Sequence, residues 1–159
     1  MKKVLCFWSN AKEPFNKLSN FAYIEDGIEY DKILYPSIEH AYQAQNFIFE
    51  DRKRFSVNGD LGCWEGLKII FKEKQYEKIY SYWKIKDNIG IVAKYSVNTK
   101  YEKQLKLTRD INFKDNDKLW MNILTKKFLK DKFKKILLKT VDYYLLEFDR
   151  FSSETKPSY

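Results

Sequence analysis

The segment YPSIEHAYQAQNF, residues 35–47, carries more structural information than any other part of the 159-residue chain. Pro36 sets the approach of the chain, and Ser37 is a residue type that is preferred at helix N-caps. A helix is therefore predicted from Ile38 to about Phe49. The apolar residues recur at helical spacing, so one face of this helix can pack inward. That face consists of Ile38, Ala41, Ala44 and Phe47.

A second face of the same predicted helix is polar. Glu39 lies in its first turn, and Tyr42, Gln43 and Asn46 follow at three, four and seven positions further on. A helix N-terminus favours an ionised carboxylate, which could stabilise positive charge that develops on a substrate. The pattern also fits a helix start that Glu39 merely completes, with the amides facing water. His40 lies on a different face, and no nucleophilic Ser or Cys motif accompanies it, so a structural role is expected.

Two apolar runs and one turn signal predict the strands. VLCFW at residues 4–8 and YYLLEF at residues 143–148 are typical of short buried strands. Asp26-Gly27 predicts a hairpin turn between residues 23–24 and residues 28–30. The sheet is expected to be small and antiparallel, and to combine this hairpin with the late strand.

Helices are predicted for most of the remainder. Residues 64–84 have the apolar spacing of one or two amphipathic helices, Asp115 can cap a further helix, and another is expected around residues 133–137. No internal repeat or low-complexity linker divides the chain. The expected fold class is α+β and helix-dominated, as a single domain over residues 1–152 with a polar tail over residues 153–159.

The composition excludes several classes of enzyme. Only 5 residues are Gly and 1 is His, and neither GxGxxG nor GxxxxGK[ST] occurs, so the common phosphate-binding loops are absent. One histidine excludes a multi-histidine zinc site, and Cys6 and Cys63 match no metal spacing. The two thiols favour a reducing compartment. No stretch approaches about 18 consecutive apolar residues, and the N-terminal run is too short for a signal peptide, so a cytoplasmic protein without a membrane segment is expected.

Positive charge is concentrated in one part of the sequence. The chain has 30 Lys and Arg against 22 Asp and Glu, a net charge of +8. Residues 100–139 contain thirteen of these cations and five of the acidic residues, so this segment alone accounts for the excess. Such a segment suits a surface that faces a polyanion. It also suits a solvated helix face, because Lys far outnumbers Arg, whose guanidinium is the better fork for phosphate.

Several segments together carry a family resemblance. LSNF at residues 18–21, the Asp26-Gly27 turn and YPSIEHAYQAQNF come first, and Ala93-Lys94, ILTKKFLKDKFKKILLKT at residues 123–140 and YLLEFDRFS at residues 144–152 follow. In this order they resemble the NADAR, or YbiA-like, family, which implies the fold of that family.

The chain also departs from the family pattern. Gln45-Asn46-Phe47 lacks the lysine that the family usually has there, and residues 64–90 are expected to be an insertion. The family commonly continues past the late strand with a W-G-x-G segment, whereas this sequence ends at Tyr159. The sequence is either a piece of a longer chain or a short member of the family, and in both cases the part of the pocket that this segment builds is not expected within these residues.

The resemblance implies an N-glycosidase that needs no cofactor and no metal. NADAR proteins cleave a base–ribose C1–N bond, either to remove ADP-ribose from guanine in DNA or to hydrolyse phosphorylated intermediates of riboflavin biosynthesis. Both reactions pass through an oxocarbenium-like sugar, which a carboxylate or a capturing nucleophile stabilises. A module that binds ADP-ribose or nucleic acid without catalysis, or an interaction protein that keeps the fold, is the alternative from a different class.

The resemblance also assigns roles to individual residues. The expected catalytic residues are Glu39 as the carboxylate, Lys94 as an amine able to form a Schiff base with the opened sugar, and Glu147 near the ribose. The expected substrate-binding residues are Ser19, Asn20, Phe21, Tyr42, Gln43, Trp120 and Asp149. A solvated lysine that ends a strand is the alternative for Lys94, a helix-core position for Trp120, and a solvent-facing pair for Glu147 and Asp149.

The basic segment distinguishes the two substrate classes. Thirteen cations over residues 100–139 would strengthen binding to DNA but add little for a free nucleotide. ADP-ribosylated nucleic acid is therefore the favoured partner, with an ADP-ribose-like nucleotide as the alternative. The role that follows is reversal of nucleic-acid ADP-ribosylation as an antitoxin or in defence, with a toxin from the same operon as a further expected partner.

Overall fold

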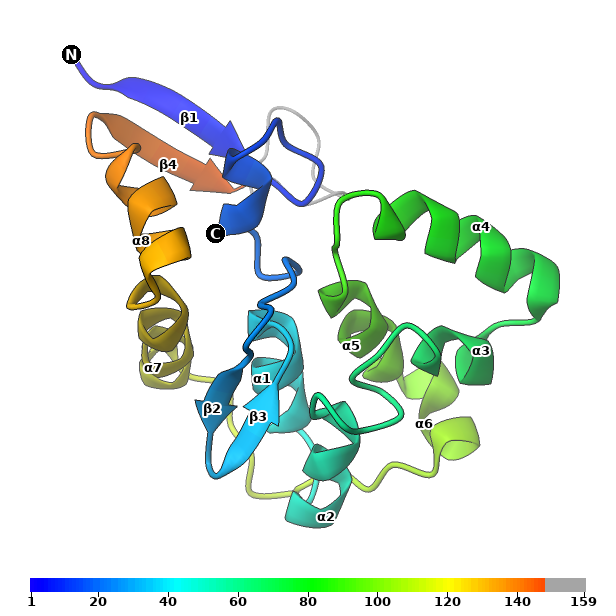
Figure 1. Ribbon diagram of the computed structural model, residues 1–159. Coiled ribbons are helices and arrows are strands. Elements are labelled where there is room, and N and C mark those ends of the chain that lie inside the picture. Colours follow the sequence, from blue (N-terminus) through cyan, green and yellow to red (C-terminus); the bar gives the residue numbers. More distant parts are fainter. Residues whose placement is uncertain (148–159) are drawn as a thin grey trace.

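A computed structural model describes residues 1–147 and shows a helix-dominated α+β protein (Figure 1). The strands are β1 (Lys3–Phe7), β2 (Ile28–Tyr30), β3 (Ile33–Tyr35) and β4 (Tyr143–Glu147). The helices are α1 (Ile38–Ala44), α2 (Phe49–Arg52), α3 (Gly66–Ile70), α4 (Glu73–Lys84), α5 (Gly90–Ser96), α6 (Thr99–Leu105), α7 (Asp117–Phe128) and α8 (Asp131–Leu138), with 3-10 turns η1 (Phe15–Leu18) and η2 (Lys53–Phe55). The predicted fold class is confirmed at this level.

Both predicted end strands form, but they pair with each other. β1 and β4 are parallel, in a register that runs from Lys3 opposite Tyr143 to Phe7 opposite Glu147. The prediction that the late strand joins the hairpin in one antiparallel sheet is therefore wrong, and only the hairpin is antiparallel. The expected burial of these strands is also wrong, because Val4 and Tyr144 are exposed on the outside of the pair.

The hairpin lies one turn later in the sequence than predicted. β2 pairs with β3, and the connection is made by Asp31 and Lys32 at φ 49° and 64°. Two successive residues in this left-handed region match the type I′ turn that hairpins favour. The Asp26-Gly27 signal instead forms a separate turn, in which Gly27 N donates to Ile24 O at 2.9 Å and Gly27 has φ 68°.

Helix α1 forms the centre of the fold. Ser37 caps it as predicted, because its Oγ accepts a hydrogen bond from His40 N at 3.1 Å. The predicted apolar face is buried, and α1 packs against α5 on one side and α7 on another. The helix ends at Ala44 rather than near Phe49, since Gln45 is its C-cap and the chain turns before α2 begins.

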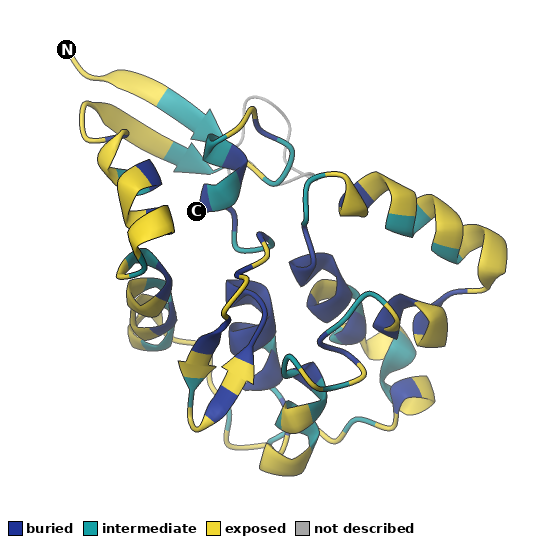
Figure 2. Cartoon of the chain, viewed as in Figure 1, coloured by how far each residue is buried: buried dark blue, intermediate teal, exposed yellow. Residues whose placement is uncertain are grey.

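Burial is greatest on α1 and α5 and least at the edges of the molecule (Figure 2). The segment predicted as an insertion contains α3 and α4, and of α4 only Trp83 is buried. Lys94, for which the end of a strand was one alternative, lies in helix α5 instead. None of the helices in residues 1–147 has both the length and the apolar character needed to cross a membrane.

Candidate active site

A loop of three residues, 19–21, ties three helices together. The Ser19 carbonyl oxygen accepts a hydrogen bond from Lys127 Nζ at 2.8 Å. The Asn20 carbonyl oxygen accepts one from the Glu39 backbone N at 3.1 Å, and the Phe21 carbonyl oxygen accepts one from the Gly90 backbone N at 2.9 Å. The three donors belong to α7, α1 and α5. LSNF, quoted from the sequence as a binding motif, therefore fixes the place where these helices meet. We call the loop, its three partners and the neighbouring Gln43, Lys94 and Glu147 the Glu39 site.

The Glu39 carboxyl is buried at the centre of this site, with 5% of the residue exposed. Burial raises the pKa of Glu39, while a 2.8 Å hydrogen bond from Gln43 Nε2 and the charge of Lys94 oppose that rise. Desolvation therefore acts against the ionised form that the helix N-terminus favours. A carboxyl of raised pKa can deliver a proton at a pH where an ordinary one cannot.

Gly90 allows α5 to approach Glu39 closely. A Cβ atom on Gly90 would lie 2.5 Å from Phe21 Cα and 3.0 Å from Glu39 Cβ. The first contact is with backbone, which cannot move aside as the end of a flexible side chain can. The sequence analysis did not single out Gly90, so its packing role was missed.

Gly90→Ala is expected to destabilise the protein by about 1–3 kcal/mol, because the added methyl group overpacks the contact between α5 and the loop. Denaturant unfolding measures this loss. Lys94→Ala, an exposed position on the same helix, is the matched control and should change stability by less than about 0.5 kcal/mol. Equal stability of Gly90→Ala and wild type would contradict the close approach.

Two of the predicted catalytic residues, Lys94 and Glu147, lie within electrostatic reach of the third, Glu39. Lys94 is exposed on α5, four residues after Gly90 and so on the same side of the helix. Its charge lowers the pKa of Glu39, whereas the charge of Glu147 raises it. Glu147, at the end of β4, also acts on Lys127. Asp149 lies outside the described residues.

Lys127 is a member of the site that the sequence analysis missed. It is completely buried, and its Nζ lies 4.9 Å from the centre of the Phe133 ring in addition to its bond with the loop. Burial lowers the pKa of Lys127 to about 7, although Glu147 opposes this shift. A signal was present, because Lys127 follows the buried Ile123 by four residues and so shares its helix face.

Two of the predicted binding residues pack on each other. The rings of Tyr42 and Trp120 are stacked, with centres 3.6 Å apart and planes 17° apart. The Tyr42 hydroxyl donates to Asp115. One face of the Trp120 ring is therefore covered by Tyr42. This contact agrees with the helix-core position that was the alternative for Trp120, and it leaves less of the ring open to a base.

The loop side chains differ in their availability to a ligand. Ser19 is buried, and its Oγ accepts from Phe21 N at 3.2 Å. The Phe21 ring lies edge-on to Trp83, with centres 5.9 Å apart. Within residues 1–147 the Asn20 amide makes no hydrogen bond and is half-buried, so it is the loop group best able to bind a ligand.

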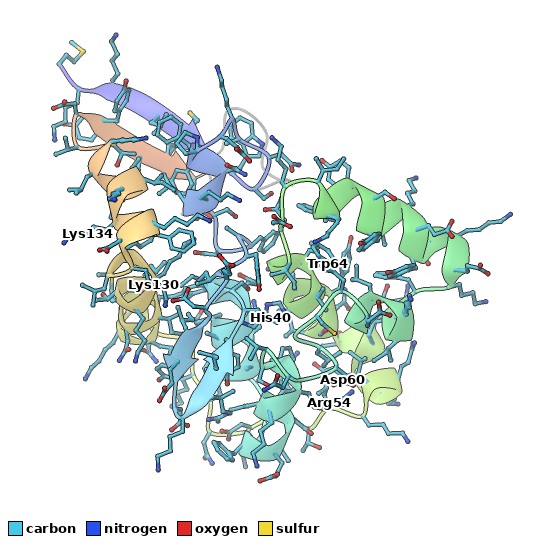
Figure 3. The ribbon with its side chains drawn as sticks, viewed as in Figure 1. His40, Arg54, Asp60, Trp64, Lys130 and Lys134 are labelled. Atoms are coloured by element: carbon cyan, nitrogen blue, oxygen red, sulfur yellow. The ribbon has the colours of Figure 1, made fainter. Side chains whose placement is uncertain are left out.

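His40 has the structural role expected for it. Its Nε2 lies 2.9 Å from Leu61 O, which can only accept, so Nδ1 accepts from Ser37 Oγ at 2.7 Å. Burial lowers the pKa of His40 to about 3, so the ring is neutral at ordinary pH. The residue lies at the centre of the fold (Figure 3) and is not a proton donor to the Glu39 site.

The basic segment does not form a single surface. α6 lies on the opposite side of the molecule from α7 and α8 (Figure 1), so the cations of residues 100–139 fall into two groups. Eleven of the thirteen are exposed, Lys127 is buried, and Lys130 pairs with Asp26 at 2.8 Å. Lys130 and Lys134 mark the α7–α8 side in Figure 3.

The residues that the structure describes include no group of three or more His, Cys, Asp or Glu side chains that could hold a metal ion. No family model, curated protein or solved structure matches the chain. The function must therefore be inferred from the chemistry of the Glu39 site.

Proposed function

We propose that this protein is an N-glycosidase of the NADAR type that removes ADP-ribose from guanine in DNA. The observation that supports this most is the buried Glu39 carboxyl, whose pKa is raised and whose position is fixed by Gln43 and by the loop of residues 19–21. Cleavage of a C1–N bond needs a proton for the leaving base and negative charge beside the developing oxocarbenium ion. One carboxyl of this kind supplies first the proton and then the charge.

Lys94 gives the reaction a covalent route. The Lys94 ammonium first gives a proton to water. The amine then attacks C1 of the ribose as the C1–N bond breaks, and the departing guanine takes the proton from Glu39. Opening of the sugar ring then gives a Schiff base between Lys94 and C1, in which the amine loses its proton to the ring oxygen. Water hydrolyses this Schiff base, which returns the free amine and releases ADP-ribose. The exposed position of Lys94 leaves its amine accessible to a substrate.

Release of ADP-ribose from guanine-ADP-ribosylated DNA by the purified protein tests the proposal directly. Chromatographic detection of free ADP-ribose, together with unmodified DNA, is the expected result. Binding of the modified DNA without any release would overturn the proposal and support a non-catalytic reader of ADP-ribose.

Turnover of the DNA substrate is expected to fall at least about tenfold between about 50 mM and about 200 mM salt, because exposed lysines of α7 and α8 bind phosphates. ADP-ribosylated guanosine monophosphate, measured in parallel, should respond little. An equal response of both substrates would support the second candidate, a hydrolase of free phosphorylated nucleotides. That candidate is favoured by the division of the basic residues between two sides of the molecule.

Borohydride is expected to trap wild-type protein covalently on the sugar during turnover, because it reduces a Schiff base to a stable amine. Lys94→Ala should lose this adduct, which intact-mass measurement detects. Lys100→Ala, also exposed and two residues into the next helix, is the control and should trap normally. Trapping by Lys94→Ala would assign the amine to another lysine.

A further inference from the structure

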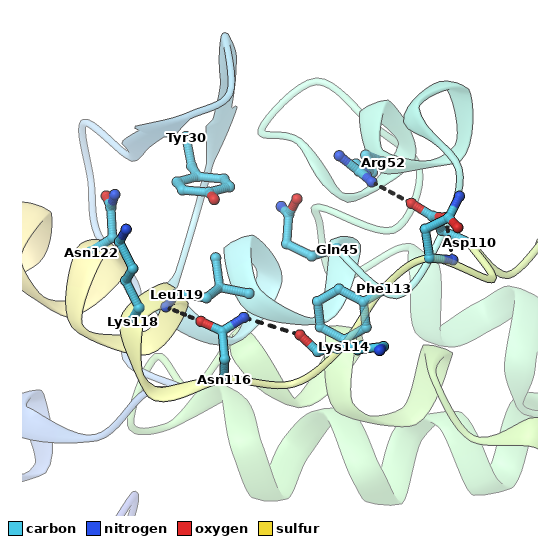
Figure 4. A pocket seen from close by; sticks show the side chains of 11 residues that line it. Tyr30, Gln45, Arg52, Asp110, Phe113, Lys114, Asn116, Lys118, Leu119 and Asn122 are labelled. Atoms are coloured by element: carbon cyan, nitrogen blue, oxygen red, sulfur yellow. Dashed lines mark hydrogen bonds and ion pairs between the residues drawn. The ribbon is translucent and has the colours of Figure 1, made fainter.

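A pocket of about 400 Å³ lies beyond the C-terminal end of α1, away from the Glu39 site (Figure 4). Its size is within the range of small-molecule pockets. Its lining residues are Tyr30, Gln45, Arg52, Asp110, Asn112, Phe113, Lys114, Asn116, Lys118, Leu119 and Asn122. None of them belongs to the Glu39 site.

Ring contacts connect the wall of the pocket with helix α1. Phe113 lines the pocket, and its ring meets the Tyr42 ring edge-on, with centres 6.2 Å apart. Tyr42 in turn stacks on Trp120. Ring contacts therefore run from the pocket wall to Tyr42 and Trp120, two of the predicted substrate-binding residues.

Part of the pocket is structural. Arg52 pairs with Asp110 at 3.1 Å, and Asn116 caps α7 by accepting from Leu119 N at 2.8 Å. Gln45 is buried, and its amide donates to Ala41 O at 2.8 Å. These contacts hold the walls in place.

Four other polar side chains of the pocket do not help to hold its walls. Within residues 1–147, the side chains of Lys114, Lys118, Asn112 and Asn122 make no hydrogen bond or ion pair, and all four are exposed. Figure 4 shows the half-buried Tyr30 ring across the space from Phe113, with Lys118 and Asn122 on the α7 side. Two ammonium groups, two amides and a half-buried aromatic ring therefore line one cavity.

We propose that this pocket binds a nucleotide, with its base against Tyr30 and its phosphate near Lys114 and Lys118. An aromatic ring binds any base by stacking, amides bind the donors and acceptors of base edges, and lysines bind phosphate. The bound group is either one nucleotide of a nucleic-acid strand or a free nucleotide, since both present the same base and phosphate chemistry. Binding does not require the glycosidase reaction. If DNA is the substrate, the pocket holds a nucleotide near the modified guanosine.

Fluorescence anisotropy with a labelled single-stranded oligonucleotide that carries no ADP-ribose tests the pocket without any turnover. Tyr30→Leu is expected to weaken binding about tenfold, as the loss of one base–aromatic stack does. Asn122→Asp is the second variant, at an exposed position where folding is not at risk, and its carboxylate should also weaken binding by repelling phosphate. Lys114→Gln with Lys118→Gln should weaken binding and reduce its salt dependence.

Lys74→Gln with Lys78→Gln is the matched control, because both residues are exposed on α4, which contributes neither to the pocket nor to the phosphate-binding lysines of α7 and α8. Competition with guanosine monophosphate identifies a free nucleotide as a ligand, and binding of the oligonucleotide alone identifies a strand. Three results would overturn the proposal: no binding of either probe, equal loss in the control pair, or competition by inorganic phosphate as effective as that by the nucleotide. None of these measures ADP-ribose release, so failure here and failure of the proposed glycosidase are separate results.

Discussion

Glu39→Gln is expected to slow the release of ADP-ribose from DNA by about 10²- to 10⁴-fold, the usual contribution of a general acid. The glutamine has the same shape, and its carbonyl oxygen can still accept the 2.8 Å hydrogen bond that Gln43 donates to Glu39. What it lacks is the proton for the leaving base and the negative charge beside C1. Single-turnover kinetics at saturating protein measures the chemical step alone. Substrate affinity, measured separately, should be the same for Glu39→Gln and wild type.

The pH dependence of this step distinguishes an acid from a merely structural residue. Burial raises the pKa of Glu39, so the protonated form persists to a higher pH than in an ordinary glutamate. Activity should therefore be present below this raised pKa and fall as pH increases through it, and Glu39→Gln should lack that fall. Glu29→Gln, at an exposed position on the hairpin, is the control and should match wild type. Turnover of Glu39→Gln within a few-fold of wild type would exclude Glu39 as the acid.

Features that depend on neighbouring residues could be predicted from the sequence. The Ser37 cap and the buried face of α1 follow from local spacing, and the structure confirms both. The positions of β1 and β4 were also predicted, because short apolar runs are a local signal. Which strands pair is decided by contacts across almost the whole chain, and neither run contains that information.

The site divides in the same way. The sequence placed Glu39 on a polar helix face, but the sign of its pKa shift depends on how α5 and the loop of residues 19–21 cover it. The need for glycine at position 90 could not be predicted, because it arises from the close approach of α5 to Phe21 and Glu39 in the folded protein. The basic segment does not form the single polyanion-facing surface expected of it for a related reason, since α6 folds onto a different side of the molecule from α7.

A fully buried lysine is costly, and Lys127 has the clearest measurable consequence for stability. Burial lowers its pKa from 10.5 to about 7 in the folded protein, with Glu147 opposing and Lys17 assisting the shift. Between these two values the unfolded chain binds more protons than the folded protein, so stability rises with pH. The gain is about 3 kcal/mol from about pH 7 to about pH 9.5. Lys127→Met should remove this part of the pH dependence, because methionine fills a similar volume and carries no charge.

Urea unfolding of wild type and Lys127→Met at several pH values measures the difference, since all other titrating groups are common to both proteins. Lys126→Met is the matched control, because Lys126 is exposed on the same helix and should keep the wild-type pH dependence. Parallel stability curves for wild type and Lys127→Met would show that Lys127 titrates normally in the folded protein. A wild-type curve that rises alone would mean that the folded protein holds Lys127 as a neutral amine over this pH range. That amine still donates to the Ser19 carbonyl and so helps to hold the loop that positions Glu39.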